Sequence, residues 1–311
     1  MNVFEKEFDF VLSRAKALKN PARVVIAGAD HEIFLQAAFE AEAAGFAIPV
    51  LVGSENKIMA LLEKYNLKDR KYQLCAVDEG ENVVQHAIDV INLGMGDILM
   101  RGNTSTRDFL MPILHKGNKL IKNDILSEVA LIKVPYYDKV LALSDVSMII
   151  HPSVEQRKSV IKNIVEVLNH LGVEHPNVAV LSLVEKPSFH MRDTVEAQSI
   201  ANAHKQEPIA DCEVVGPIPW DLIVSKEAAR LKNYNCPLCG EFDAVLMPDV
   251  MAGNTVMKVL LMSANVNSAG VIAGASIPIA VTSRSSSVEH GFLSLAVCAA
   301  MLQDEKAHKE K

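Results

Sequence analysis

The sequence lacks the features that mark membrane, secreted and nucleic-acid-binding proteins. No apolar run approaches the roughly 20 residues that a membrane-spanning helix needs. The five cysteines are an odd number scattered over 311 residues, which does not suit the disulfide framework of a small secreted domain. The net charge of −7 is spread along the chain, without the clustered basic residues of a nucleic-acid surface. Since the first residues also lack the apolar segment of a signal peptide, we expect a soluble cytoplasmic protein.

Several cofactor and catalytic motifs are missing as well. The first strand-like run, RVVIAGADHE, holds a single glycine, so the GxGxxG fingerprint of dinucleotide binding is absent. Neither a P-loop nor the GxSxG elbow of a hydrolase occurs. The CPLC segment at 236–239 has no second cysteine pair and no nearby pair of histidines. A zinc site there lacks ligands, and two incidental thiols are favoured over a redox pair.

Alternating strand and helix patterns predict the fold class. Half of the residues are hydrophobic, which permits a sizeable core and about two domains. Runs rich in β-branched residues predict strands at 23–29, 48–53, 72–78, 97–102, 129–135, 139–145, 178–184, 212–217, 242–249 and 270–281. Helical spacing predicts helices at 4–18, 32–45, 56–66, 81–94, 104–117, 154–172, 194–206, 225–232, 255–264 and 292–302. This alternation is typical of an α/β fold with mainly parallel sheets.

Polar segments that follow strands are the places to look for chemistry, because ligands of such folds gather at the carboxyl ends of strands. In the last of these segments, VTSRSSSVEHG, Ser286 and Glu289 have the spacing of a helix capping box. That pairing leaves Ser283, Arg284 and His290 unexplained. A charged imidazole in a first helical turn would oppose the helix dipole, so we expect His290 to be neutral.

The segment RGNTSTRDFL also joins a predicted strand to a predicted helix. Backbone N–H groups at a helix start, together with hydroxyl side chains, favour an anion site. Arg101 and Arg107 could add bidentate contacts to phosphate. The alternative is structural: Thr104 or Ser105 caps the helix, and Arg107 pairs with Asp108 or with solvent.

The segment MPDVMAGNTVMK offers a third polar junction. Asp249 stands at a predicted strand end, and Gly253 would permit a close backbone approach. Asn254 is expected to cap the next helix, with Lys258 one turn later. The alternative is an ordinary helix start with an exposed lysine.

Taken together and in their order, these segments resemble the phosphate acetyl/butyryltransferase family. The resemblance rests on RGNTSTRDFL, VVGPIPWDLIVSKEAARLK, FDAVLMPDVMAGN and AGVIAGASIPIAVTSR and spans nearly the whole chain. The PD-x(2)-AGN-x(3)-K block followed by PI-x(2)-TSR is specific to it. The short chain and the NTST-x-DFL motif resemble the butyryl branch more than the acetyl branch.

The resemblance implies an acyltransferase that moves a short-chain acyl group between CoA and phosphate. The thiolate of CoA would attack the acyl phosphate in a ternary complex, without a metal or redox cofactor. The expected architecture is two α/β domains with a cleft between them, similar to isocitrate and isopropylmalate dehydrogenases. Residues 1–135 with 277–311 would form the first domain and 136–276 the second. Members of the family are generally homo-oligomers, dimers or larger.

The resemblance also implies roles for individual residues. Ser283 would donate to the transition state, and Arg284 would hold the phosphate or the thioester oxygen. The substrate-binding residues would be Arg101, Asn103, Thr104, Thr106, Arg107, Asp249, Gly253, Asn254 and Lys258.

Two departures from the family pattern concern these roles. Acetyl-branch members carry a catalytic aspartate seven residues after the serine, where this chain has His290, preceded by Glu289. Either His290 is the base, or Glu289 is, or the thiol loses its proton in another way. Met111 stands near the place of a common family arginine, so Arg101 or Arg107 substitutes for it or that contact is missing.

Two other functions fit parts of the sequence, and a third does not. The chain could be a phosphate acetyltransferase, because one methylene changes specificity by only about 1–3 kcal/mol. It could also be a catalytically weak binding protein for CoA or acyl phosphate. A decarboxylating dehydrogenase of the isopropylmalate type would need an aspartate cluster for metal and nicotinamide contacts, and the sequence offers neither.

Overall fold

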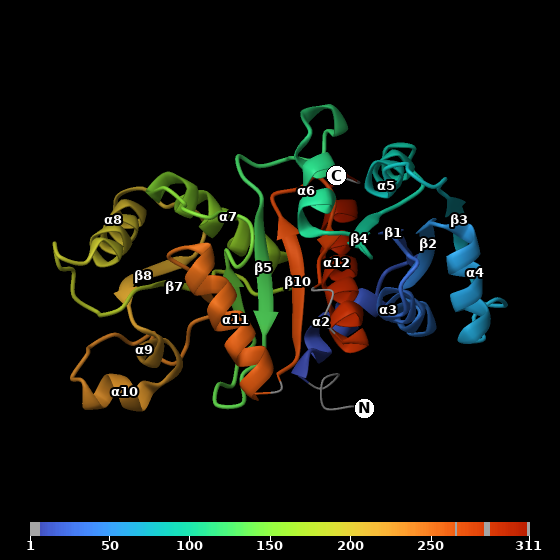
Figure 1. The fold of residues 1–311 in the computed structure, drawn as a ribbon. Coiled ribbons are helices and arrows are strands. Elements are labelled where there is room, and N and C mark those ends of the chain that lie inside the picture. The colour runs from blue at the N-terminus through green and yellow to red at the C-terminus, as the bar shows by residue number, and fades with distance from the viewer. Residues whose placement is uncertain (1–6, 265, 283–286, 310–311) are drawn as a thin grey trace. The chain divides into compact units, whose positions relative to one another are not determined.

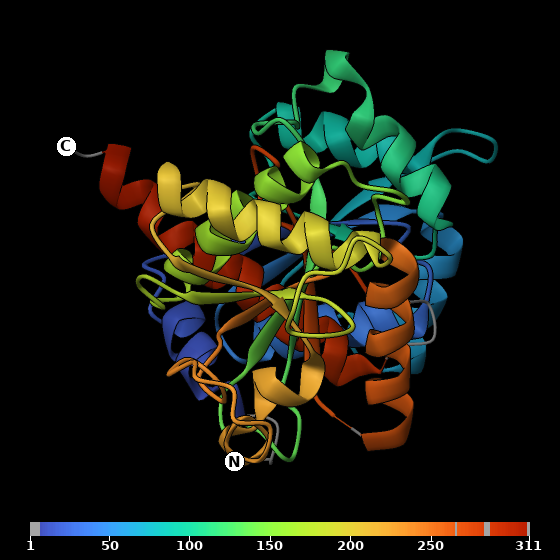
Figure 2. The same cartoon turned by 90° about the vertical axis from the view of Figure 1, so that its left-hand side faces the viewer.

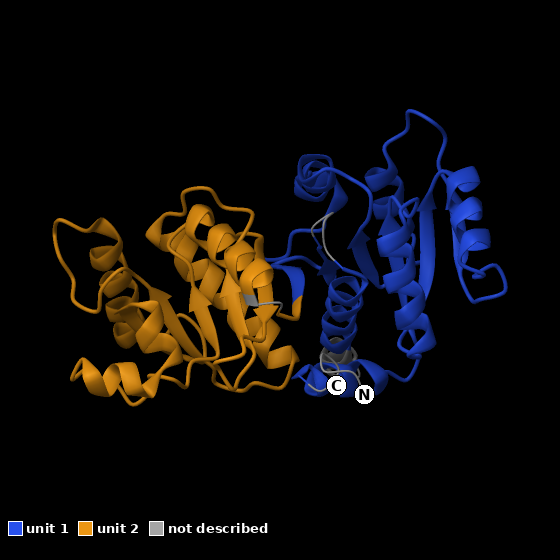
Figure 3. Ribbon diagram, turned by 60° about the horizontal axis from the view of Figure 1, so that its bottom comes forward, with its two compact units in different colours: residues 1–123, 269–311 blue, residues 124–268 orange. Residues whose placement is uncertain are grey.

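The computed structural model describes residues 7–264, 266–282 and 287–309. The chain divides into two compact units, which Figure 3 colours separately. Unit 1 comprises residues 1–123 and 269–311, and unit 2 comprises residues 124–268. None of the helices in the described part of the chain is both long and apolar enough to cross a membrane. The predicted domains, 1–135 with 277–311 and 136–276, stay a prediction.

The sheet of unit 1 places several strand ends at one edge. Its strands are β1 (Ala22–Ala27), β2 (Ala47–Gly53), β3 (Gln73–Ala76), β4 (Ile98–Arg101), β10 (Ser268–Ala273) and β11 (Ile279–Ala280). They follow one another in the order β3-β2-β1-β4-β11-β10. All neighbours from β3 to β11 are parallel, and only β10 runs antiparallel to β11. The predicted mainly parallel α/β arrangement is confirmed.

The helices of unit 1 include the last one of the chain. They are α2 (Asp9–Lys16), α3 (Glu32–Ala43), α4 (Glu55–Lys64), α5 (Val83–Asn92), α6 (Thr106–Leu114), the short η1 (Lys116–Asn118) and α12 (Val288–Lys309). α12 packs against α2 and α3 (Figure 1). Phe292 of α12 packs against Phe46, with ring centroids 5.5 Å apart and the ring planes tilted by 56°. The apolar run of α12 is therefore a central part of the core of unit 1.

Unit 2 repeats the architecture with a shorter sheet. Its strands are β5 (Ser127–Ile132), β6 (Leu141–Ser144), β7 (Asn177–Leu181), β8 (Glu213–Ile218) and β9 (Ala244–Leu246), in the order β5-β6-β9-β7-β8. β5 and β6 form the antiparallel hairpin expected from the YYD turn, and the other neighbours are parallel. The carboxyl ends of β6, β9 and β7 therefore meet at one edge.

The helices of unit 2 are α7 (Val154–His170), α8 (Arg192–Gln206), α9 (Trp220–Val224), α10 (Lys226–Leu231) and α11 (Val250–Ala264). α7 and α8 contact each other (Figures 1 and 2). α9, α10 and α11 contribute Leu222, Ala229 and Met257 to an apolar cluster with Val245 of β9. The next strand residue, Leu246, lies instead beside α7, as the alternation of side chains along a strand requires.

α11 and α12 begin well before the positions predicted from the sequence. α11 begins at Val250 and not at 255, because the Asp249 carboxylate accepts a hydrogen bond from the N–H of Ala252 at 2.8 Å and caps the helix. The predicted cap, Asn254, is wrong: its side chain donates to the carbonyl of Val146 at 3.0 Å.

α12 begins at Val288, four residues before the predicted 292. The hydroxyl of Ser287 accepts from the N–H of His290 at 3.3 Å. Ser287 therefore caps this helix. The capping box of Ser286 with Glu289 stays a prediction, because Ser286 lies outside the described residues.

Candidate active site

Three parallel strand ends form the candidate site of unit 1. Met100 of β4 pairs with Ile26 of β1 on one side and with Ala280 of β11 on the other. The carboxyl ends of the three strands therefore meet, and the RGNTST segment and Thr282 follow them at the same edge. Ser283 and Arg284, the predicted acyl- and phosphate-handling residues, come next in the sequence and lie outside the described residues.

Two glycines hold the loop after β4 against the end of β1. The N–H of Gly102 donates to the carbonyl of Ala27 at 3.0 Å, and the N–H of Asn103 donates to Gly28 at 2.8 Å. A Cβ atom on Gly102 would lie 2.2 Å from the carbonyl oxygen of Gly28. The sequence reasoning did not assign these glycines, although a glycine directly after each strand was the available signal.

Two threonine hydroxyls at this edge are buried and have no hydrogen-bond partner among the described residues. Within the described part of the chain, Oγ1 of Thr104 and Oγ1 of Thr282 make no hydrogen bond, although both atoms are inaccessible to solvent. Buried hydroxyls are almost always paired in folded proteins. The pair is therefore a candidate for contact with a ligand. Thr104 was predicted from the sequence, whereas Thr282 was missed.

The remaining residues of the segment divide into buried and exposed positions. Arg101 is buried, and its Nη2 and Nε donate to the carbonyl of Thr104 at 2.8 and 3.3 Å. Ser105 caps α6 by accepting from the N–H of Asp108 at 3.0 Å, which settles the cap between the two expected candidates. The side chains of Asn103, Thr106 and Arg107 are exposed.

The first turn of α12 carries the two candidate bases. Glu289 is exposed and His290 is partly buried. Burial lowers the pKa of His290 to about 4, so the imidazole is neutral at pH 7. A Cβ on the following Gly291 would lie 2.7 Å from the Cβ of Ala37 in α3. The start of α12 therefore packs closely on that helix.

The other predicted residues lie in unit 2, where β9 leads into α11. A Cβ on Gly253 would lie 2.4 Å from the carbonyl oxygen of Asp145, and Asn254 bonds the neighbouring Val146. These contacts seat the start of α11 on the turn after β6. Asp249, Gly253 and Asn254 are thus brought together. The Lys258 side chain is exposed and lines an open hollow along α11 with Thr255 and Met262.

The turn after β6 is fixed by the carboxylate of Asp145, which the sequence reasoning did not single out. Asp145 is 5% exposed, and its oxygens accept from the backbone N–H groups of Glu128, Ser147, Met148 and Ile149 at 2.9, 3.3, 2.9 and 2.5 Å. Four backbone donors on one carboxylate make this turn a rigid support for α11. The signal was an aspartate directly after an apolar strand.

The thiol of Cys239, in the CPLC segment of unit 2, is buried. Burial raises the pKa of the Cys239 thiol to about 12, so this thiol stays protonated and unreactive at neutral pH. Among the described residues, no three His, Cys, Asp or Glu side chains are grouped so that they could hold a metal ion.

Comparisons with known proteins match residues of both units to the same family. The family described as Phosphate acetyl/butaryl transferase matches residues 78–300. The phosphate butyryltransferase of Clostridium beijerinckii is 31% identical over 94% of this chain and 97% of its own length. The phosphate acetyltransferase of Thermotoga maritima is 30% identical over 89% of this chain and 94% of its own length. The crystal structure of a branched-chain phosphotransacylase from Enterococcus faecalis V583 has a TM-score of 0.80 and 30% identity, covering 91% of this chain and 99% of that one.

Proposed function

The chain belongs to the phosphate acetyl/butaryl transferase family, and from that premise we propose that it moves a butyryl or similar short-chain acyl group between CoA and inorganic phosphate. It is an acyltransferase, as the members of this family are. One observation carries the proposal. The ends of β1, β4 and β11 bring the RGNTST segment and Thr282 to one edge, with two buried hydroxyls that have no partner among the described residues.

The reaction needs three kinds of group at such an edge. The sulfur of CoA attacks the carbonyl carbon of the acyl phosphate, the bond from that carbon to the phosphate oxygen breaks, and phosphate leaves. Ser283 donates to the developing oxyanion, and one such donor lowers the barrier by about 3 kcal/mol. Arg284, with Thr104 and the exposed Asn103, Thr106 and Arg107, binds the departing phosphate. Neither a metal nor a redox cofactor enters these steps.

The CoA thiol must lose its proton before it attacks. The neutral state of His290 at pH 7 supports a role as acceptor, but a base whose pKa is about 4 is poorly matched to a thiol of pKa about 8.5. Exposed Glu289 is the second candidate. His290→Gln and Glu289→Gln separate the two: replacement of the base lowers kcat by about 10²-fold or more, and the other replacement leaves kcat within a few fold.

The predicted specificity for butyryl over acetyl groups rests on the NTST-x-DFL motif and the short chain. The relatives carry both names, so phosphate acetyltransferase activity is the second candidate. Phosphate-dependent release of thiol from acetyl-, propionyl-, butyryl- and isobutyryl-CoA tests the choice. We expect the highest kcat/KM with a four-carbon acyl group, and a maximum with acetyl-CoA would assign the acetyl activity.

A catalytically weak binding protein is the third candidate, because His290 stands where acetyl-branch members have aspartate. Tight binding of CoA without turnover of any short-chain acyl-CoA would identify it. For the enzyme, initial velocities should give intersecting patterns, since both substrates bind before thiolate attack. Activity should also survive a metal chelator. A homo-oligomer, at least a dimer, and a cytoplasmic location stay predictions.

A further inference from the structure

Arg157 occupies a position where the helix pattern calls for an apolar residue. Its side chain is only 1% exposed. It lies on the buried face of α7, one turn before Val160 and Ile161. Burying a charged group costs several kcal/mol unless other charges compensate. The cost of burying this charge suggests that Arg157 has a specific role.

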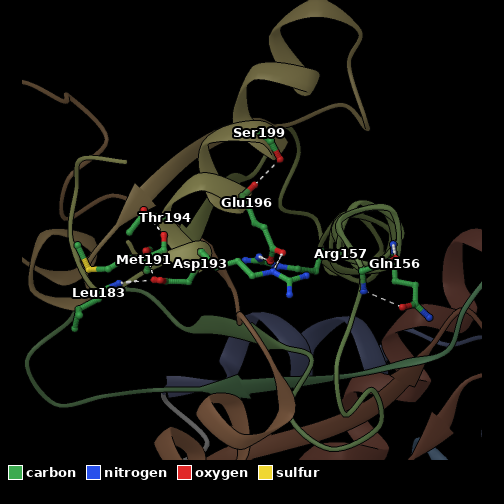
Figure 4. A network of polar contacts seen from close by, with 11 residues as sticks. Gln156, Arg157, Leu183, Met191, Asp193, Thr194, Glu196 and Ser199 are labelled. Atoms are coloured by element: carbon green, nitrogen blue, oxygen red, sulfur yellow. Dashed lines mark hydrogen bonds and ion pairs between the residues drawn. The ribbon is translucent and has the colours of Figure 1, made fainter. Parts of the chain in front are cut away.

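The guanidinium makes no hydrogen bond with any described residue. Nε, Nη1 and Nη2 of Arg157 are all buried and without such partners. Its ion pair is with Glu196 of α8, at 3.6 Å between Nη1 and Oε2 (Figure 4). Burial lowers the pKa of Arg157, against the opposing effect of Glu196, Asp193 and Asp249. The guanidinium nevertheless stays charged at neutral pH.

The carboxylates around Arg157 use their hydrogen bonds elsewhere. Asp193 accepts from the hydroxyl of Ser182 at 2.5 Å and from the N–H of Leu183 at 3.2 Å (Figure 4). Glu196 accepts from Nε of Arg192 at 2.6 Å. The bonds to Asp193 fix the start of the loop between β7 and α8, whereas the bond between Arg192 and Glu196 lies within α8. Arg157 therefore contributes a charge to this group of acids and no hydrogen bond.

Asp249 and Arg157 line the same hollow of unit 2. The hollow has no room for a water molecule. It is lined by Asp145, Ile149, Pro152, Arg157, Val160, Leu246, Met247 and Asp249. The negative charge of Asp249 attracts the guanidinium across this hollow and favours its charged state. Asp249 also caps α11 through the N–H of Ala252.

We propose that Arg157 is a positioning residue, whose buried positive charge holds Asp249 and the first turn of α11 against the turn after β6. Without that charge, the carboxylates of Asp193, Glu196 and Asp249 would repel one another at the same edge. Asp249 would then leave its capping position, and the contacts of Gly253 and Asn254 would loosen. The consequence for catalysis, though not for structure, rests on the proposed function.

Hydrogen exchange tests the structural part without any assay of activity. In the full chain, Arg157→Met should accelerate exchange of the amides of residues 250–254 by about 10-fold or more, and should leave residues 161–170 of α7 as in the wild type. Arg157→Lys, which keeps the charge, should retain the protection. Lys158→Met removes a surface charge from the same helix and is the matched control. Unchanged exchange at 250–254 in Arg157→Met, or equal acceleration throughout α7, would overturn the proposal.

Kinetics test the consequence for the reaction. A loosened active-site residue can cost about 10²-fold in rate, so we expect kcat/KM of Arg157→Met to fall by about 10-fold to 100-fold. Because Arg157 acts through Asp249, Asp249→Asn in the same chain should add little further loss. Additive losses would contradict the proposal. A wild type that releases no thiol would refute the proposed function, and the exchange result would still decide the role of Arg157.

The lysine variant covers the case in which Arg157→Met does not fold. Its ammonium keeps the positive charge and lacks the planar fork of donors. Protection of residues 250–254 in Arg157→Lys would support positioning by charge. Loss of that protection in a folded Arg157→Lys would overturn it.

Discussion

Thr104 and Thr282 at the edge of unit 1 carry buried hydroxyls that form no hydrogen bond with the residues described in the structure. Exchange of Thr104 for the isosteric valine should therefore leave the free energy of unfolding unchanged or slightly higher, because no hydrogen bond is lost. The same change removes a phosphate ligand in the proposed function, so the KM for phosphate should rise by about 10-fold, the effect of roughly 1.4 kcal/mol. Urea unfolding and phosphate titration of the initial rate measure the two effects.

Thr194 is the matched control for this exchange. It is also buried, but its hydroxyl donates to the carbonyl of Met191 at 2.7 Å and accepts from the N–H of Ser188 at 2.8 Å. Thr194→Val should cost about 1–3 kcal/mol of unfolding free energy. Equal destabilisation by the two exchanges, or an unchanged KM in Thr104→Val, would count against the proposed role of Thr104.

His290 predicts a pH dependence of stability. Its pKa is about 4 in the folded chain and about 6.5 when unfolded, so the unfolded state binds more protons between these values. The stability from neutral burial is therefore present above pH 6.5 and is lost as the pH falls toward 4, by about 3 kcal/mol in total.

His290→Gln should flatten this part of the pH dependence. Unfolding free energies at several pH values between 4 and 7 measure it, with the exposed His115→Gln as the control for the substitution itself. A wild-type slope retained in His290→Gln would show that another group is responsible.

At the residue scale, the sequence predicts types of residue better than their contacts. Thr104 and Arg101 were predicted as site residues because their motif follows a strand. Nothing in the motif shows that the Arg101 guanidinium donates to the carbonyl of Thr104. The sequence did not predict Arg157 or Thr282 as site residues. Their side chains are buried without hydrogen-bond partners among the described residues, and this is known only when their neighbours in the fold are known.

Among the elements, the loop between β4 and α6 depends most on one small residue. Gly102→Ala places a Cβ 2.2 Å from the carbonyl oxygen of Gly28, and neither backbone can yield without separating β4 from β1. We expect a loss of about 1–3 kcal/mol in unfolding free energy, the usual range for overpacking. Catalytic activity should fall further, because the phosphate-side loop moves.

Gly117→Ala is the control, because its Cβ would meet only the side chain of His115, at 3.0 Å. That exposed side chain can turn away at little cost. Thermal unfolding of both variants compares them. A Gly102→Ala variant as stable as Gly117→Ala would disprove the close approach of the two strand ends.

The kinds of element could be predicted from periodicity, but not all of their ends. α7, with an apolar stripe and a serine cap, begins at Val154 as expected. The start of α11 was placed five residues late, because its first turn, VMAGN, has a weak apolar period. Its cap, Asp249, follows a proline at the end of a strand, and only contact with the turn after β6 shows that the helix already begins there.

For the whole molecule, the sequence was sufficient to predict the α/β class and the family. Alternation of strands and helices requires parallel neighbours, and the order of the motifs matches one family along most of the chain. The grouping of side chains within each unit could not be predicted in this way. It depends on strand order, which places β11 beside β4 and β9 between β6 and β7.

The central claim is that this chain transfers an acyl group between CoA and phosphate. Release of free thiol from butyryl-CoA by the purified protein, followed with and without inorganic phosphate, tests it most directly. We predict phosphate-dependent release that persists with a chelator and falls by about 10²-fold or more in Ser283→Ala, the effect of losing one oxyanion donor. Release of no thiol from any acyl-CoA between acetyl and isobutyryl, or release that does not depend on phosphate, would contradict the claim.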